Sequence, residues 1–168
     1  IVQKTRPHIA DLLKKHAPAD VNIVVIGGAG ASGAGAGPLI VRELMNRGQN
    51  ILIGLVGTKT GSSTELNNTI ATIQTLANYT KATKIPLATY YLQNDENNSM
   101  GSVDEGMRSM IRSATALFSN KNHGLEITDM TNFLNYNRQT AYDAALVNFD
   151  FFLGQPEIPD HMQAIAQV

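Results

Sequence analysis

A glycine-rich stretch at residues 27–38 constrains the fold of this chain more than any other feature. Six of its first eleven residues are glycine, with only Ala and Ser between them. It follows the apolar run 21–26 and precedes the helix-forming segment 39–47. Strand, glycine loop and helix in this order present backbone N–H groups and a helix N-terminus to an anion. We predict an anion-binding loop over 27–37, with Pro38 as the first helical residue; a tight turn without a ligand is the alternative.

The rest of the chain alternates apolar runs with segments of helical periodicity. Strands are predicted at 21–26, 51–56 and 86–92. Helices are predicted at 5–16, 39–47, 66–79 and 101–119. A short helix at 129–137 and a half-buried strand at 147–151 follow. Strands that alternate with helices predict an α/β, Rossmann-like fold, with a mostly parallel sheet and helices on both faces. The loops 27–37, 57–63 and 93–99 then lie together at the carboxyl ends of the strands, where such sheets bind ligands.

Two of the predicted helices carry start signals and apolar stripes. Ser62 with Glu65, and Ser102 with Glu105, form capping-box patterns. The first of these helices is expected to bury Leu66, Ile70, Ile73 and Ala77. The second is expected to bury Val103, Met107, Met110, Ile111, Ala114, Leu117 and Phe118.

Composition excludes several classes of function. The 168 residues suffice for one domain or slightly more, and 43% hydrophobic with 16% charged residues is typical of a globular protein. A net charge of -1 and the lack of a basic run argue against nucleic-acid and membrane partners. The absence of Cys excludes disulfides and a cysteine nucleophile and favours the cytoplasm. The four histidines lack metal-ligand spacing, so no metal site built from protein side chains is predicted.

Residues 28–33 also match the dinucleotide fingerprint G-x-G-x-x-G after a strand. That fingerprint needs an acidic residue at the end of the next strand to hold the ribose, where this chain has Gly57, Thr58 and Lys59. A lysine there suits a 2′-phosphate, so an NADP-dependent oxidoreductase remains an alternative. A P-loop is excluded because no Gly-Lys-Ser/Thr follows the glycines.

Residues 29–35, Ala-Gly-Ala-Ser-Gly-Ala-Gly, resemble the glycine signature of the tubulin/FtsZ family of GTPases. The sequence departs from that signature at Ala31, where the family has Gly, and at Ser32, where it has Thr. Residues 53–59, Ile-Gly-Leu-Val-Gly-Thr-Lys, resemble the strand of the same family that ends in a Thr-Lys turn.

Three later segments continue the resemblance in the family's order. Residues 92–95, Leu-Gln-Asn-Asp, resemble its apolar-Pro-Asn-Asp strand end, and 101–119 resembles its long central helix. Residues 124–129, Gly-Leu-Glu-Ile-Thr-Asp, resemble the loop that reaches the nucleotide of the next subunit. The resemblance covers about residues 5–135, so the expected fold is the nucleotide-binding type of that family.

The resemblance implies GTP or GDP with Mg²⁺ as cofactors, and head-to-tail self-association. It assigns nucleotide contacts to Gly30, Ala31, Ser32, Gly33, Ala34, Gly35, Thr58, Lys59, Asn94 and Asp104. It makes Asp129 the catalytic residue that polarises the attacking water on the neighbouring subunit's nucleotide. Asp129 also suits a helix N-cap, as Thr128 does.

Two departures bear on activity. The family usually has Asn and two acidic groups in the post-helix loop, at the positions of Ile127, Asp129 and Asn132, and Glu126 is one residue out of register. Slow or degraded hydrolysis is therefore expected. The family's first phosphate loop and its next two loops precede the segment that begins at Ile1, so we expect an upstream piece to complete the pocket.

The sequence thus predicts a GTP-binding, filament-forming protein with a nucleotide-binding α/β domain over residues 1–120. Residues 121–168 are expected to form the post-helix loop and the start of a second domain or a tail. Besides the oxidoreductase, a non-enzymatic structural protein that keeps the fold without a nucleotide remains an alternative, so enzymatic activity stays open.

Overall fold

The computed structural model describes residues 2–118, 126–150 and 157. Its helices are α1 (Val2–Lys15), α2 (Ala31–Asn46), α3 (Ser63–Thr83), α4 (Met100–Phe118) and α5 (Ile127–Leu134), followed by a 3-10 turn at Tyr136–Arg138. Its strands are β1 (Val21–Gly27), β2 (Asn50–Thr58), β3 (Leu87–Asn94) and β4 (Leu146–Asn148). The predicted alternation of strands and helices is confirmed.

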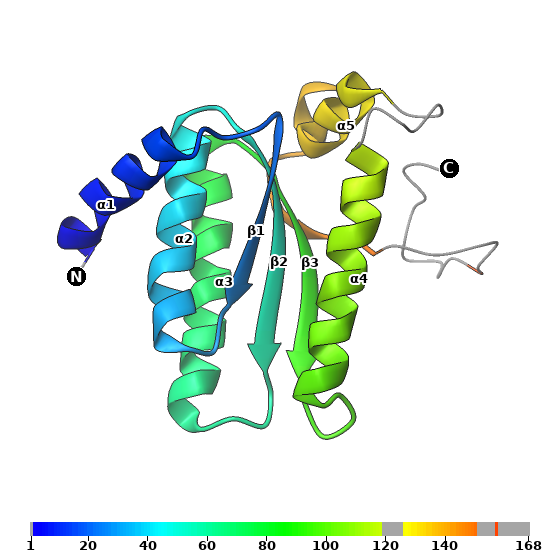
Figure 1. The fold of residues 1–168 in the computed structure, drawn as a ribbon. Helices are drawn as coiled ribbons and strands as arrows, with labels where there is room; N and C mark the ends of the chain where they lie inside the picture. Colours follow the sequence, from blue (N-terminus) through cyan, green and yellow to red (C-terminus); the bar gives the residue numbers. More distant parts are fainter. Residues whose placement is uncertain (1, 119–125, 151–156, 158–168) are drawn as a thin grey trace.

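The four strands form one parallel sheet in the order β1-β2-β3-β4. Figure 1 shows α2 and α3 side by side on one face of the sheet and α4 on the other. Each parallel connection passes through at least one helix, which supplies the length that a crossover needs. The predicted α/β fold with helices on both faces is confirmed.

The sheet is covered by an apolar cluster on each face. The cluster under α2 and α3 includes Val41, Ile53 and Leu76, all fully buried. The cluster under α4 includes Leu52 and Met110. Neighbouring residues of β2 therefore enter opposite clusters, which explains why that strand is apolar without alternation.

The helix α2 takes in most of the glycine-rich stretch, contrary to the sequence prediction. Its N-cap is Gly30 and its first residue is Ala31, so Pro38 lies inside the helix and not at its first position. The predicted loop over 27–37 shortens to residues 28–30, which we call the glycine loop.

Close packing against β1 explains the early start of α2. A Cβ atom on Gly33 would overlap the carbonyl oxygen of Gly27, and one on Gly37 would lie 2.7 Å from the Ile26 side chain. Only glycine lets the helix cross the strand at this distance. Glycine lowers helix propensity, but the glycines at these two positions are what allows α2 to pack this close to β1.

The helix α3 buries a threonine-rich face and not the apolar stripe that we predicted. Its buried residues are Thr69, Thr72, Leu76 and Thr80. Ile70 is 53% exposed, and Leu66, Ile73 and Ala77 are only partly buried. The Thr69 and Thr72 hydroxyls donate to carbonyl oxygens one turn earlier, at 3.0 and 2.8 Å. Because their polar atoms are satisfied inside the helix, the threonine methyl groups can pack against the sheet.

One of the two predicted capping boxes is confirmed. The Ser62 hydroxyl accepts from the Glu65 N–H at 3.3 Å, and the Glu65 carboxylate accepts from the Ser62 N–H at 2.7 Å. The second prediction is wrong, because Ser102 lies inside α4 and donates its N–H to the Ser99 hydroxyl at 3.2 Å. Glu105 pairs with Arg108 instead, at 2.9 Å.

The apolar stripe predicted for α4 is buried at four of its seven positions, which are Val103, Met107, Met110 and Ala114. The other three, Ile111, Leu117 and Phe118, are partly buried.

The end of the described chain packs on the same sheet. The short helix predicted at 129–137 is α5, which begins two residues earlier and lies at the amino end of β2, where the Asn135 amide donates to Asn50 Oδ1 at 2.9 Å. The strand predicted at 147–151 is shorter and begins one residue earlier: β4 covers Leu146–Asn148 and pairs with β3. Residues 149–150 are not in a strand, and residue 151 lies outside the described residues. The division of the chain at residue 120 stays a prediction.

Candidate functional site

Three loops meet at the carboxyl edge of the sheet, as predicted. The strands β1, β2 and β3 end at Gly27, Thr58 and Asn94, and the pairing register runs across all three ends. The Lys59 N–H donates to the Asn94 carbonyl at 2.9 Å. In Figure 1 these loops lie together at the lower end of the molecule, where α2, α3 and α4 begin.

The glycine loop is packed on one side and open on the other. A Cβ atom on Gly28 would lie 3.1 Å from the Leu55 side chain, whereas one on Gly30 would meet nothing within 4 Å. The Gly28 N–H donates to the Val56 carbonyl at 2.8 Å. Gly35, one turn into α2, also faces open space. No contact within the described residues explains a glycine at these two open positions.

The N-terminus of α2 has no side-chain cap. Gly30 adopts an extended N-cap conformation (φ -79°, ψ 142°) without a side-chain hydrogen bond. Within the part of the chain that the structure describes, the N–H groups of Ala29, Gly30 and Ala31 have no hydrogen-bond partner. Unpaired N–H groups at a helix start favour a bound anion.

Polar side chains of α3 hold the glycine loop from behind. The Asn68 amide donates to the Ala29 carbonyl at 3.0 Å, and the Thr72 hydroxyl lies 3.3 Å from the Gly28 carbonyl. The sequence analysis missed both residues, because it assigned the buried face of α3 to the apolar residues. The capping-box pattern at Ser62 predicts where the helix begins. An asparagine in the second turn from that start was the signal in the sequence that could have identified Asn68.

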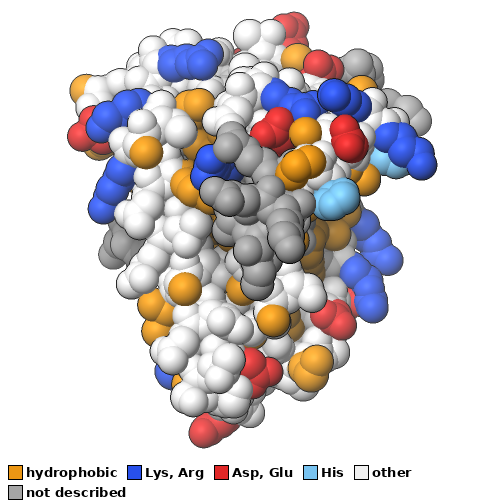
Figure 2. Space-filling view, turned by 90° about the vertical axis from the view of Figure 1, so that its left-hand side faces the viewer, with side chains coloured by type: hydrophobic (Ala, Val, Ile, Leu, Met, Phe, Trp, Pro, Cys, Tyr) orange, Lys and Arg blue, Asp and Glu red, His pale blue; other side chains and the backbone are white. Residues whose placement is uncertain are grey.

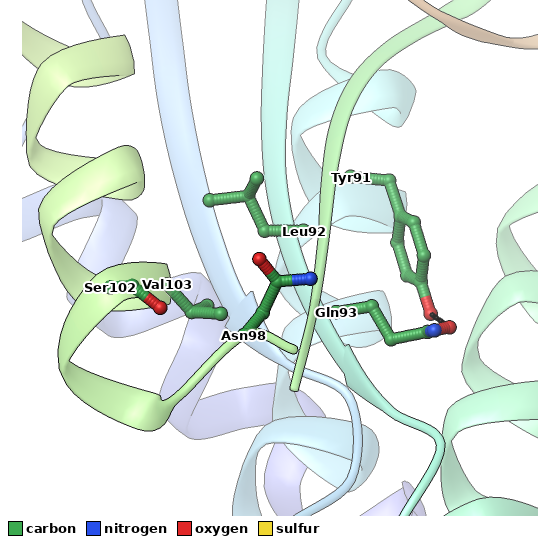
Figure 3. A pocket seen from close by; sticks show the side chains of 6 residues that line it. All are labelled: Tyr91, Leu92, Gln93, Asn98, Ser102 and Val103. Atoms are coloured by element: carbon green, nitrogen blue, oxygen red, sulfur yellow. Dashed lines mark hydrogen bonds between the residues drawn. The ribbon is translucent and has the colours of Figure 1, made fainter. Parts of the chain in front are cut away.

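A pocket of about 300 Å³ opens where β3 meets α4. Its walls, drawn in Figure 3, are Tyr91, Leu92, Gln93, Asn98, Ser102 and Val103. Apolar side chains line it together with amide and hydroxyl groups, a composition typical of small-molecule sites. The pocket adjoins the carboxyl end of β3, the same edge of the sheet as the glycine loop, and no residue of the glycine loop lines it.

Asp95 organises the turn beside this pocket. Its Oδ1 accepts from the N–H groups of Asn97 and Asn98, both at 2.9 Å, and Gln93 approaches its Oδ2 at 3.4 Å. The Tyr91 hydroxyl in turn donates to Gln93 at 3.1 Å. The Asn97 N–H, opposed by desolvation and reinforced by Asn98 and Gln93, holds the pKa of the Asp95 carboxyl below its ordinary value.

Most of the predicted contact residues lie together at this edge, and one does not line the pocket. The glycine loop, Thr58, Lys59 and Asn94 lie together, and the amide oxygen of Asn94 is buried without a partner among the described residues. Asp104 lies on the exposed side of α4 and is not part of the pocket wall.

Asp129 lies at the opposite end of the sheet. Its carboxylate accepts from the Glu126 N–H at 3.0 Å, so it closes the first turn of α5 from the third helical position, and the N-cap itself is Glu126. The strand β2 spans about 26 Å between the two ends. One copy of the chain therefore cannot bring Asp129 to its own glycine loop.

Few basic side chains surround the site. Lys59 is the single Lys or Arg in loops 27–37, 57–63 and 93–99. On the face drawn in Figure 2, most Lys and Arg side chains lie in the upper half, and Asp or Glu side chains stand among uncharged ones toward the lower end. Among the described residues, no three His, Cys, Asp or Glu side chains gather as a metal site, and none of the described helices could cross a membrane.

Comparison with curated proteins identifies relatives among bacteriophages. The chain is 27% identical over 143 residues to the phage tubulin-like protein of Pseudomonas phage phiKZ, covering 80% of the chain and 43% of the relative. It is 30% identical over 143 residues to that of Pseudomonas phage 201phi2-1, covering 84% of the chain and 45% of the relative. The chain thus spans somewhat less than half the length of these relatives. No family model matches it.

Solved structures agree with these relatives. The structure of the phage tubulin PhuZ with GDP matches with a TM-score of 0.80 and 28% identity, over 88% of this chain and 47% of the other. A PhuZ201 filament matches with the same TM-score, identity and coverage. The first of these structures is a phage tubulin with GDP, and the second is a filament.

Proposed function

The chain is a divergent, phage-type member of the tubulin/FtsZ-like family, and from that premise we propose that it binds a guanine nucleotide at the carboxyl edge of its sheet. The observation that carries this proposal is the uncapped start of α2. Gly30 has open space around it, and the N–H groups beside it have no partner in the described chain. A phosphate group satisfies such donors and the partial positive charge of the helix end.

The predicted contacts divide into three groups in this proposal. The glycine loop and the first turn of α2, which include Ser32, contact the phosphates. Thr58 and Lys59 contact the phosphates or the ribose, and Lys59 is the cation that offsets their charge. Asn94 and Asp104 contact the sugar and the base. The orphaned Asn94 oxygen fits this role, because a buried amide oxygen without a partner costs free energy that a ligand donor recovers.

Magnesium would arrive with the nucleotide. The described residues gather no set of carboxylates that would hold the ion alone. Mg²⁺ is commonly held by substrate phosphates together with one or two carboxylates, and it would neutralise phosphate charge where this chain offers a single lysine.

The placement of the two ends supports the proposal of head-to-tail self-association. The glycine loop and Asp129 lie at opposite ends of β2, so Asp129 can reach a nucleotide only on a second copy. A related protein was solved as a filament. A contact between unlike ends generates an open filament when its rotation does not close. Of the three family positions in this loop, Asp129 is then the only one with an acidic residue to act on the neighbour's nucleotide. Slow hydrolysis is expected because the other groups are missing.

Titration calorimetry with GTP, GDP and NADPH tests the nucleotide proposal. Binding of GTP and GDP without NADPH is expected, and the ligands should raise the melting temperature by mass action. Binding of NADPH alone would replace the proposal with the oxidoreductase. Binding of none of the three, both by this chain and by a longer chain that includes the expected upstream piece, would favour a structural protein that has kept the fold without a nucleotide.

A further inference from the structure

We infer that Asn68 of α3 is a positioning residue of the glycine loop: its amide holds the Ala29 carbonyl, and this turns the Gly30 N–H toward the phosphates of the bound nucleotide. The inference rests on the proposed function. The Asn68 Nδ2 to Ala29 oxygen distance is 3.0 Å, between residues 39 positions apart in the chain. Asn68 touches the loop from behind and does not itself contact the nucleotide.

The geometry of the peptide group carries the argument. The structure has no cis peptide bond, so the Ala29 carbonyl and the Gly30 N–H point in opposite directions within one plane. Because Asn68 holds the oxygen toward α3, the hydrogen of the same peptide points away from α3. The Gly30 N–H has no partner among the described residues, and a Cβ added to the same residue would also meet nothing within 4 Å, so Gly30 is open to a ligand.

The preceding peptide follows the same pattern. The Gly28 carbonyl lies 3.3 Å from the Thr72 hydroxyl, which makes its shorter bond, 2.8 Å, to the Asn68 carbonyl. Two successive loop carbonyls are thus directed toward α3, and the N–H groups of Ala29 and Gly30 are directed away from it. Unpaired N–H groups that face the same open side beside a helix start can bind one anion together. Asn68 makes the direct bond, so its loss is expected to matter more than that of Thr72.

The Gly28 N–H and the Gly30 carbonyl have backbone partners, whereas the peptide between Ala29 and Gly30 is held, among the described residues, only by Asn68. Glycine has more backbone freedom than other residues, so two glycines in three positions leave the Ala29 peptide free to rotate. A rotated peptide would present a carbonyl oxygen to the phosphates and repel them. The nucleotide would then have to turn the peptide back at the expense of its affinity.

The test compares Asn68→Ala with Asn67→Ala. Asn67 is the exposed neighbour on the same helix, so both substitutions change helix propensity alike and only one removes the bond to the loop. GTP, GDP and guanosine are titrated into each labelled protein, and the Gly30 N–H signal is followed by heteronuclear NMR. Asn68→Leu, which keeps volume without a donor, serves as a second variant if the alanine variant does not fold.

Asn68→Ala is expected to weaken GTP and GDP binding about fivefold to tenfold, the effect of one hydrogen bond, and to leave guanosine binding unchanged. Asn67→Ala should match the wild type with all three ligands. The inference is overturned if Asn68→Ala and Asn68→Leu bind GTP as Asn67→Ala does, or if guanosine is weakened as much as GTP. A wild-type protein that binds no GTP overturns the proposed function, and the inference with it.

Discussion

Of the three helices that begin at the carboxyl edge of the sheet, α2 and α3 begin in different ways. The start of α3 is closed by its own residues, because Ser62 and Glu65 satisfy each other's N–H groups. The start of α2 has Gly30 at the N-cap, no side-chain bond and open space around it. Ser, Thr and Asn are the usual N-cap residues, and α3 has one of them whereas α2 has glycine. An uncapped helix start leaves N–H groups that an anion can pair with, which is what the proposed phosphate site requires.

The glycines of α2 show the same division within one helix. Gly33 and Gly37 are required by packing against β1, whereas Gly30 and Gly35 face open space. The packing glycines determine where the helix starts and the open ones determine what can approach it. Substitutions at the two kinds of position should therefore separate stability from binding.

Gly33→Ala has the largest expected effect. Its new methyl group would overlap the carbonyl of Gly27, which is main chain and cannot rotate away. The free energy of unfolding should fall by about 3 kcal/mol or more, since the helix must move off the strand. Denaturant unfolding measures this loss. A loss of under about 1 kcal/mol would show that α2 does not cross β1 at this distance.

Ser62→Ala should lower the free energy of unfolding by about 1 kcal/mol, through loss of the N-cap of α3. The hydroxyl accepts from the Glu65 N–H and donates to the Glu65 carboxylate at 2.8 Å, and both bonds disappear. Nucleotide affinity should stay within about twofold, because the α2 start is untouched. A variant as stable as the wild type, measured by denaturant unfolding, would contradict the contrast between the two helix starts.

The sequence predicted the architecture well, because strand and helix periodicities are local signals. It also predicted that three loops converge, which follows from the parallel order alone. It failed at the start of α2. The glycine content predicted a loop there, whereas the close packing of Gly33 on Gly27, which depends on the tertiary structure, permits a helix. The second capping box failed similarly, since Ser99 provides an earlier start for α4.

The candidate site was predictable where it depends on chain order and not where it depends on side-chain direction. The positions of Thr58 and Asn94 at strand ends follow from the strand boundaries. The role of Asn68 depends on which face α3 turns to the sheet, and that face is set by self-satisfied threonines that hydrophobic periodicity does not detect. The nucleotide contacts themselves stay predictions.

Gly30→Asp should leave stability almost unchanged and abolish nucleotide binding. An aspartate at an N-cap gains only a few tenths of a kcal/mol over glycine, and nothing within 4 Å of the new Cβ obstructs it. Its carboxylate, however, would occupy the anion site and repel a phosphate. Calorimetry with GTP, beside a melting curve, measures the two effects. Binding at wild-type affinity would place the nucleotide away from the α2 start.

The smallest expected effect is the pH dependence of the capped end. The Ser62 N–H, followed by the Ser62 hydroxyl, holds the pKa of the exposed Glu65 carboxyl below its ordinary value of 4.5 against a small desolvation effect. A carboxyl whose pKa is lower in the folded state stabilises the protein fully above its unfolded pKa, and this contribution is lost as the pH falls through the folded pKa. Glu65→Gln should therefore be less stable than the wild type at neutral pH, and the difference should shrink as the pH falls below 4.5. Unfolding curves of both proteins across that range measure it. A difference that stays constant with pH would mean that the negative charge of Glu65 does not stabilise the capping box. The starts of α2 and α3 would then differ in hydrogen bonding and helix propensity but not in the effect of a charged cap.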